Sequence, residues 1–219
     1  NYSLLAVQGP KSILLLQELT DLNLSDIKYY SFKIGTIAEI ENVILSRTGY
    51  TGEIGFELYV KNENVKQLWN AIFNTSIALK PIGLAARDTL RLEKGFCLYG
   101  NDLSDTTSPI EAGLGWITKF SKEFINHKQL KSQKLNGTNK RLVGLELIDK
   151  GVARKDYPIL NNNGDEIGIV TSGTMSPTLG KAIALAYILS EYKKYGTEVF
   201  VNIRNKRIRA VVTSLPFVK

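Results

Sequence analysis

The sequence predicts an α+β protein in which antiparallel sheets with flanking helices are followed by a small C-terminal antiparallel β-barrel. Helical and strand patterns alternate up to about residue 139, whereas only short strand patterns follow Leu142. The dipeptide Asn163-Gly164 lies between two apolar runs, which is a strong signal for a two-residue β-hairpin turn. We therefore expect two domains, residues 1–139 and residues 140–219.

Apolar spacing predicts three helices and three strands in the first domain. The expected helices are 12–22, 65–73 and 84–94, and the expected strands are 4–7, 43–45 and 54–60. In the second helix, Leu68, Trp69 and Ile72 should face the core. Residues 97–118 should form loop and strand, because Gly, Asp, Ser and Thr are frequent there.

The second domain should contain only short strands. They are expected at 143–147, 158–160, 167–170, 182–188, 198–203 and 207–212. The polar stretch 171–180 is expected to be a long loop between two of them. Residues 204–209 should form a basic hairpin tip, which could bind phosphates but has no interleaved aromatic residues for stacking on single strands.

The composition is that of a folded chain, with 43% hydrophobic and 22% charged residues among 219, which argues against disorder. No apolar run reaches the roughly 20 residues that span a bilayer, so we expect no membrane association. No targeting segment is evident. The chain opens in the strand-like run 4–7, as a piece cut from inside a domain would.

A single cysteine and a single histidine limit the chemistry. Cys97 has no partner for a disulfide, which fits a reducing compartment, and its apolar neighbours predict a buried thiol. With His127 as the only histidine, a His/Cys metal cluster and a Ser-His-Asp triad both lack their parts. We expect no metal, although a site built from carboxylates alone is left open.

The net charge of +7 is unevenly distributed. Residues 1–139 contain 15 basic and 14 acidic residues, whereas residues 140–219 contain 13 basic and 7 acidic residues. A basic surface of this kind attracts nucleic acid, an acidic protein or a polyanionic ligand, and charge alone does not choose among them.

Two charged positions are candidates for ligand binding. Strand alternation places Glu57 on the face opposite Ile54, Phe56 and Leu58, so it faces either solvent or the wall of a cleft. Arg87 and Arg91 lie four residues apart on one helix face, where like charges repel by about 0.2–0.5 kcal/mol. That face favours carboxylate partners or an anionic ligand, and the alternative is an ordinary solvated basic face.

Six segments, taken in order, resemble the aminomethyltransferase family, which is the T-protein of the glycine cleavage system. They are residues 5–10 (LAVQGP), 47–53 (RTGYTGE), 83–93 (GLAARDTLRLE), 98–102 (LYGND), 171–177 (TSGTMSP) and 216–218 (PFV). Each segment is moderately specific, and the ordered set, which extends over nearly the whole chain, is highly specific.

The resemblance implies a three-domain α+β protein that ends in a small β-barrel and binds tetrahydrofolate in a central hole. It implies transfer of an aminomethyl group from the lipoyl arm of the H-protein, with release of ammonia and formation of 5,10-methylenetetrahydrofolate. The residues that match the family's folate contacts are Glu57 and Arg87, with Tyr50 as a weaker candidate. A carboxylate can accept two hydrogen bonds from a pterin edge, and an arginine can donate to a carbonyl or a carboxylate.

The sequence departs from the family at both ends. The family's catalytic aspartate lies in an N-terminal portion without a match in these residues, so we expect no catalytic residue here and no activity from these residues alone. A tyrosine that contacts folate in the family lies beyond Pro216-Phe217-Val218. The resemblance implies a cytoplasmic protein in bacteria, or a mitochondrial matrix protein in a eukaryote.

Three other functions are weighed against this one. The nearest are other folate-dependent enzymes of the same fold, such as the folate domain of a sarcosine or dimethylglycine oxidase, or a demethylase. A related iron–sulfur assembly protein has a Lys-Gly-Cys-Tyr-x-Gly-Gln-Glu segment, from which residues 94–102 differ. A nucleic-acid-binding module built on the basic barrel is the alternative of a different class, although we expect no nucleic-acid partner.

Overall fold

The computed structural model describes residues 1–219, which form two compact units, Asn1–Leu90 and Arg91–Lys219. The division between the units falls within a single helix, α3 (Leu84–Glu93). None of the helices has the length and apolar character needed to cross a membrane.

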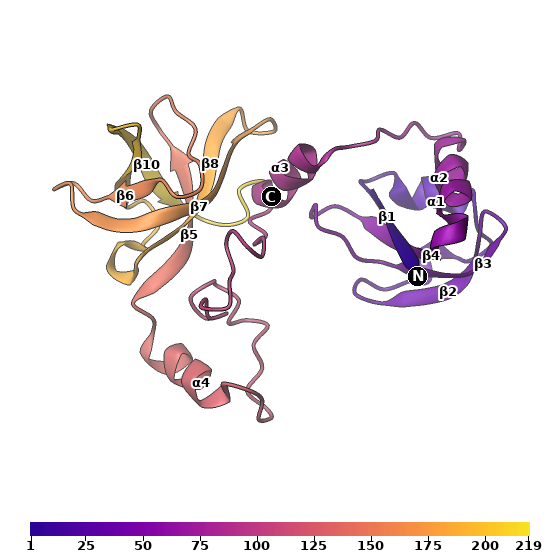
Figure 1. The fold of residues 1–219 in the computed structure, drawn as a ribbon, viewed down its shortest axis with the longest axis horizontal. Coiled ribbons are helices and arrows are strands. Elements are labelled where there is room, and N and C mark those ends of the chain that lie inside the picture. Colours follow the sequence, from indigo (N-terminus) through magenta and orange to yellow (C-terminus); the bar gives the residue numbers. More distant parts are fainter. The chain divides into compact units, whose positions relative to one another are not determined.

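The first unit is a four-stranded antiparallel sheet with helices (Figure 1). Its strands are β1 (Tyr2–Gln8), β2 (Phe32–Ile37), β3 (Ile40–Ser46) and β4 (Gly55–Lys61), in the spatial order β1-β4-β3-β2. Its helices are α1 (Ser12–Gln17) and α2 (Val65–Phe73), with short 3₁₀ turns η1 (Leu24–Asp26) and η2 (Asn62–Asn64).

One face of this sheet carries the core of the first unit. Phe56, Leu58 and Val60 of β4 are buried there, together with Leu16 of α1 and Leu68 of α2. Side chains at alternate positions of a strand point to opposite faces, so the residues between these core positions lie on the other face. Both helices thus pack on a single side, and the other side of the sheet has no helix of this unit over it.

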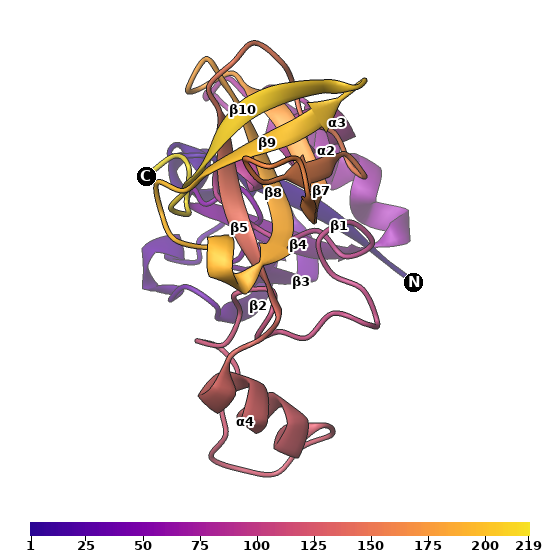
Figure 2. The same cartoon turned by 90° about the vertical axis from the view of Figure 1, so that its left-hand side faces the viewer.

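The second unit is built around a closed six-stranded antiparallel barrel, and Figure 2 shows several of its strands side-on. Its strands are β5 (Lys140–Leu147), β6 (Pro158–Leu160), β7 (Glu166–Ser176), β8 (Lys181–Leu189), β9 (Glu198–Ile203) and β10 (Lys206–Thr213). Their order around the barrel is β10-β5-β8-β7-β6-β9. The unit also contains α4 (His127–Asn136) and the 3₁₀ turn η3 (Ser190–Tyr192).

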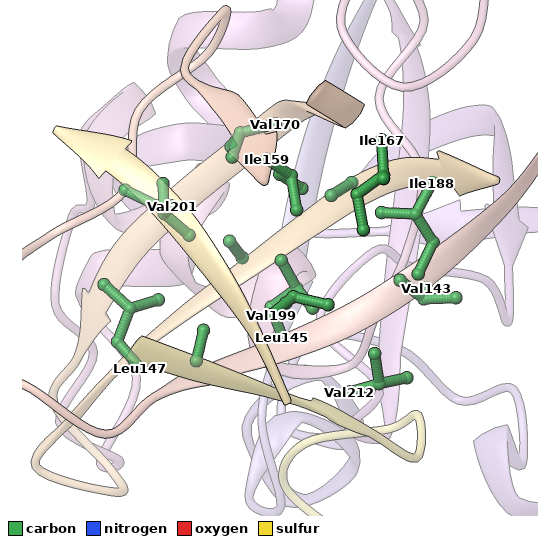
Figure 3. Packing of buried hydrophobic residues seen from close by; sticks show 14 of the residues in the cluster. Val143, Leu145, Leu147, Ile159, Ile167, Val170, Ile188, Val199, Val201 and Val212 are labelled. Atoms are coloured by element: carbon green, nitrogen blue, oxygen red, sulfur yellow. The ribbon is translucent and has the colours of Figure 1, made fainter. Parts of the chain in front are cut away.

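Inward-facing aliphatic side chains fill the barrel (Figure 3). Leu145, Val199 and Val201 are fully buried among them, and Val143 and Val212 lie in the same cluster. Residues of a barrel strand alternate between the inside and the outside, so an outward-facing residue is buried only where other side chains cover the barrel wall. β5 is buried at consecutive positions because a second apolar cluster, which includes Leu142 and Leu185, packs outside the barrel wall.

The predicted fold class is confirmed, and several elements lie where the sequence placed them. Helix α2 spans 65–73 as predicted. The Asn163-Gly164 signal lies in the β6–β7 hairpin, but the connection comprises residues 161–165 and is not the predicted two-residue turn. The basic tip joins β9 to β10, with Arg204 and Asn205 both at positive φ, as a tight two-residue hairpin turn requires.

Four local predictions in the first unit and the chain after it are wrong. Trp69 is exposed although Leu68 and Ile72 are buried, so the buried stripe of α2 is narrower than predicted. Helix α1 ends at Gln17, well short of residue 22. Ile54 precedes β4 and is exposed. Residues 97–118 contain no strand beyond an isolated bridge between Tyr99 and Leu103.

Three more differences concern two polar stretches and Cys97. Residues 171–176, predicted as a loop, continue strand β7 and pair with β8. Residues 127–136, for which the sequence predicted no helix, form helix α4. Cys97 is only partly buried, not fully as predicted. In β7 the polar residues form a strand because their hydroxyl groups have buried partners.

Candidate functional site

Glu57 lies on the side of the first sheet that the helices leave open. The strand register aligns it with Ala6 of β1 and Ser46 of β3, and Ser46 in turn pairs with Phe32 of β2. The adjacent row across the four strands is apolar and consists of Leu4, Tyr59, Ile44 and Ile34. Glu57 is therefore the one carboxylate in these two rows, and it is flanked by apolar side chains, several of them exposed.

The Glu57 carboxylate has one engaged and one available oxygen. Thr48 donates its hydroxyl hydrogen to Oε2 of Glu57, and Thr48 Oγ1 also lies 3.0 Å from Oγ of Ser46. Oε1 accepts no hydrogen bond within the chain. A carboxylate held at one oxygen is oriented, and the other oxygen remains able to accept from a ligand.

Gln8 anchors the glycine-rich segment that precedes β4. Its Nε2 donates to the carbonyls of Thr48 (3.1 Å) and Phe56 (3.3 Å). A Cβ added at Gly49 or Gly55 would lie within 2.0–2.1 Å of Oε1 of Gln8. The end of the Gln8 side chain thus occupies the space that a Cβ would take at either position. Sequence reasoning quoted Gln8 as part of a motif without assigning it this role.

Tyr50, within that segment, contacts Arg87 of α3. The guanidinium carbon of Arg87 lies 4.7 Å from the centre of the Tyr50 ring, within the range of a cation–π interaction. Arg87 is exposed and its side chain makes no hydrogen bond or ion pair within the chain, so its donors are available. No ion pair joins Arg87 to Glu57. Their placement around one shared cleft stays a prediction.

Arg91, one helical turn further along α3, is fully buried and paired, so the solvated alternative for it is wrong. Its Nη1 lies 2.7 Å from Oδ2 of Asp102, and both side chains are completely excluded from solvent. Nη1 also donates to the carbonyl of Phe96 (2.8 Å), and Nη2 donates to the hydroxyl of Ser172 (2.8 Å). A buried guanidinium is stable when its donors are satisfied in this way.

Asp102 is the acceptor around which this network is arranged. Ser172 (3.0 Å) and the backbone N–H of Leu98 (2.9 Å) donate to Oδ2, and Thr171 donates to Oδ1. The hydroxyl of Tyr187 donates to the backbone carbonyl of Asp102 (2.9 Å). The carboxylate thereby fixes the loop 98–102 and the polar part of β7 at once.

Glu93 forms a second buried link of the same kind. Its Oε1 accepts from the hydroxyl of Ser176 (2.5 Å) and the N–H of Thr178 (3.2 Å), and Oε2 accepts from the hydroxyl of Thr178 (2.9 Å). Ser176 and Thr178 lie at the β7–β8 turn. The buried end of α3 is thus tied to that turn through one carboxylate.

These contacts join three of the six segments that carry the family resemblance. Residues 91–93, 98–102 and 171–178 supply the donors and acceptors of two buried networks. The sequence signal was the dense pattern of Ser and Thr in β7, which strand alternation alone does not explain. These residues hold the second unit together.

The environment of Cys97 disfavours its thiolate. Burial, and next the negative charge of Asp102, raise the pKa of Cys97 from an ordinary value of 9.0 to about 11. Burial is also the first cause that raises the pKa of Tyr187. A thiol of this kind is a poor nucleophile at neutral pH.

No group of three or more His, Cys, Asp or Glu side chains is placed to hold a metal ion. A cavity of about 390 Å³ lies at Glu123–Gln129, around the start of α4. Its lining includes none of Glu57, Arg87 and Tyr50, so the candidate residues rest on their own geometry and not on this cavity.

Both parts of the chain match known family models. Residues 1–122 match the GCVT N-terminal domain, and residues 140–219 match the glycine cleavage T-protein C-terminal barrel domain. The chain belongs to the glycine cleavage T-protein family. Within the family, the aminomethyltransferase of Bacteroides thetaiotaomicron is 55% identical over 223 residues, which cover 100% of this chain and 62% of that protein.

Two other members of the T-protein family also match all or nearly all of this chain. The aminomethyltransferase of Flavobacterium psychrophilum is 52% identical over 100% of this chain and 61% of its own length. The crystal structure of glycine cleavage system aminomethyltransferase T from Bartonella henselae superposes with a TM-score of 0.90 at 33% identity. It covers 99% of this chain and 60% of that one. This T-protein family chain therefore spans less than two thirds of the length of the relatives it matches.

Proposed function

We propose that the chain is part of a tetrahydrofolate-dependent aminomethyltransferase of the glycine cleavage system. The aminomethyl group would come from the lipoyl arm of the H-protein, and the products would be ammonia, dihydrolipoyl H-protein and 5,10-methylenetetrahydrofolate. Tetrahydrofolate would serve as co-substrate, without a metal. Membership of the T-protein family supports the reaction class.

The observation that carries the folate site is the carboxylate of Glu57. It stands among apolar side chains on the open side of the sheet, and its Oε1 is unengaged. A pterin has flat apolar faces and an edge of N–H donors, so it matches an apolar surface that bears one oriented acceptor. Removal from water strengthens such a hydrogen bond.

Arg87 and Tyr50 would complete the site. The guanidinium N–H groups of Arg87 could donate to a carbonyl or to the glutamate tail of folate. The ring of Tyr50 stacks against the guanidinium and would hold it in place. In this proposal Glu57, which follows the segment that Gln8 anchors, and Arg87, which contacts Tyr50 within that segment, both bind folate.

The alternatives differ in the donor of the one-carbon unit. An oxidase folate domain or a demethylase would use sarcosine, dimethylglycine or another methylamine and would not need a lipoyl carrier. Nothing in the buried networks of the second unit favours one donor. The choice rests on the T-protein family match, which includes the C-terminal barrel.

The product of the complete open reading frame should be assayed for methylenetetrahydrofolate with each donor in turn. We expect formation only with aminomethyl-lipoyl H-protein and tetrahydrofolate together, with one ammonia released per product. Equal formation from sarcosine or dimethylglycine without the carrier would instead favour an oxidase-linked function. The 219 residues alone should be inactive in the same assay, and turnover by them would show that the catalytic group has been misplaced.

A further inference from the structure

The side-chain amide of Gln8, at the end of β1, makes hydrogen bonds through its nitrogen only. Nε2 donates to the carbonyls of Thr48 (3.1 Å) and Phe56 (3.3 Å), whereas the enclosed Oε1 accepts no hydrogen bond. A buried acceptor without a partner is unfavourable, and an apolar side chain would fill the same space without that cost. The two N–H donors, and not packing, therefore explain an amide at this position.

These two donors tie together the ends of the connection between β3 and β4. Thr48 follows β3 closely, and Phe56 lies near the start of β4. In the register of β1 with β4, Gln8 lies opposite Gly55, so strand pairing itself places the amide between the two carbonyls. The path of the backbone through Thr48 thus depends on Gln8.

Thr48 connects this anchor to Glu57. Its carbonyl accepts from Gln8, and its hydroxyl donates to Oε2 of Glu57. Glu57 is half-buried, and its Oε1 makes no hydrogen bond within the chain. A displacement of the Thr48 backbone would therefore move the hydroxyl that orients the carboxylate.

We propose that Gln8 is a positioning residue for Glu57 and acts through Thr48. Resting on the proposed function, this gives Gln8 a part in tetrahydrofolate binding that is exerted through Glu57 and not through a contact of its own. An acceptor that is already oriented binds more tightly, because less side-chain freedom is lost on binding. The alternative is that Gln8 only stabilises the β3–β4 connection.

Ser12 provides a matched control in the same connection. Its buried hydroxyl donates to the carbonyl of Ile54 (3.0 Å), which also accepts from a backbone N–H. Ser12→Ala therefore removes one anchor of the connection and leaves the contacts from Gln8 through Thr48 to Glu57 intact. If Gln8 had only a structural role, loss of either anchor would have the same effect on Glu57.

The first measurement needs no ligand and uses the 219-residue chain. Gln8→Met keeps an unbranched side chain and removes both donors, and Thr48→Val keeps the shape of the side chain and removes the hydroxyl. NMR scalar couplings report the side-chain torsion angles of Glu57. We expect one rotamer in the wild type and in Ser12→Ala, and averaging over rotamers in Gln8→Met and Thr48→Val. Averaging in the wild type, or the same result for Ser12→Ala and Gln8→Met, would overturn the proposal.

The second measurement is calorimetric titration of tetrahydrofolate into the complete open reading frame product. We expect Gln8→Met to bind about 2- to 12-fold more weakly, the equivalent of the 0.5–1.5 kcal/mol that ordering one side chain costs. Ser12→Ala should bind as the wild type does. In a Glu57→Ala background, Gln8→Met should cause no further loss, because two residues that act through one contact are not additive. A further loss there would overturn a role exerted through Glu57.

Gly49→Ala disturbs the same anchor without changing Gln8 itself. The φ angle of Gly49 is not positive, so its backbone can accept alanine. The new Cβ would lie 2.0 Å from Oε1 and 2.8 Å from Nε2 of Gln8, so the amide must move away from its two acceptors. Gly49→Ala should therefore release Glu57 as Gln8→Met does, and Glu57 couplings like those of the wild type would contradict the proposal.

Failure of the proposed function has a different signature. In that case the wild-type product does not bind tetrahydrofolate, or Glu57→Ala binds it unchanged, while the NMR couplings still show that Gln8 holds Glu57. Weaker binding by Glu57→Ala together with wild-type binding by Gln8→Met would instead overturn the positioning role alone.

Discussion

Arg91 and Asp102 form an ion pair of 2.7 Å in which neither side chain is exposed to solvent. The pair connects the end of α3 to the loop 98–102, and Ser172 joins both to the barrel. Charges buried to this degree are tolerated only when they are paired and fully hydrogen-bonded. The relationship therefore makes a sharp prediction about stability.

We expect Asp102→Ala to destabilise the second unit by about 3–5 kcal/mol, because it leaves the buried Arg91 without its carboxylate. Urea unfolding of the 219-residue chain, followed by circular dichroism, measures the change. Glu146→Ala is the control, since it breaks the exposed pair with Lys181 and should change stability by about 1 kcal/mol or less. Similar losses of unfolding free energy in the two variants would mean that the buried ion pair contributes no more to stability than the exposed one.

Cys97 should react slowly with thiol reagents in the folded chain. Its pKa is raised from 9.0 to about 11, so at pH 8 the thiolate fraction falls on the order of 100-fold. Partial burial slows the reaction further. The rate with a disulfide reagent should rise steeply when the chain is unfolded in urea. Equal rates in the two states would contradict the raised pKa.

The same thiol makes folding stability depend on pH. Because the folded pKa lies above the unfolded one, the unfolded chain loses its proton first as the pH rises. The contribution of Cys97 is therefore complete below pH 9.0 and is lost towards pH 11. Cys97→Ala should flatten the loss of stability over this window, which urea unfolding at several pH values would measure. An identical pH profile in the variant would assign the loss to other groups, such as Tyr187.

The proposed boundary at residue 139 can be tested by expressing residues 140–219 alone. We expect a folded β-barrel, because its aliphatic core is contributed by β5–β10 and the loops between them. It should be less stable than residues 91–219, since Thr171, Ser172 and Ser176 lose Asp102 and Glu93 as partners. A disordered circular dichroism spectrum would place the boundary nearer to the division at Leu90.

Arg87→Lys should weaken tetrahydrofolate binding by the complete open reading frame product. A lysine keeps the charge but loses the planar donors that suit a carboxylate or carbonyl, and it stacks less well on Tyr50. Equilibrium dialysis against tetrahydrofolate measures the change, with Lys66→Arg on α2 as an exposed control. Equal tetrahydrofolate affinities of the wild type and the Arg87→Lys variant would mean that Arg87 belongs to a solvated basic face and does not bind folate.

Patterns of apolar spacing predicted the fold well because burial determines them. Leu68 and Ile72 were placed correctly, and the closed barrel follows from its short strands and its Asn-Gly turn. The prediction that Trp69 is buried was wrong, because the apolar pattern of a helix does not show how wide the buried part of its surface is. Both β-hairpins were accessible because turn chemistry is local, although the β6–β7 connection is longer than the Asn-Gly pair predicted.

The polar interior could not be predicted in the same way. The hydroxyl groups of Thr171 and Ser172 are satisfied by Asp102, 69 and 70 positions away, and spacing along the chain carries no sign of that contact. The spacing of Arg87 and Arg91 is compatible with a solvated basic face as well as with carboxylate partners, and it does not identify Asp102 as the partner of Arg91. For Glu57, strand alternation gave the face correctly, but only the register showed its apolar neighbours.

The most direct test of the account is calorimetric titration of tetrahydrofolate into the complete open reading frame product and its Glu57→Ala variant. The variant loses an oriented acceptor, and a charged hydrogen bond of this kind is worth about 1.5–3 kcal/mol, or roughly 10- to 150-fold in Kd. Glu41→Ala, an exposed carboxylate on β3, is the matched control and should bind as the wild type does. We predict a loss in that range for Glu57→Ala alone. Wild-type affinity in the variant, or no folate binding by the wild type, would contradict the proposed site.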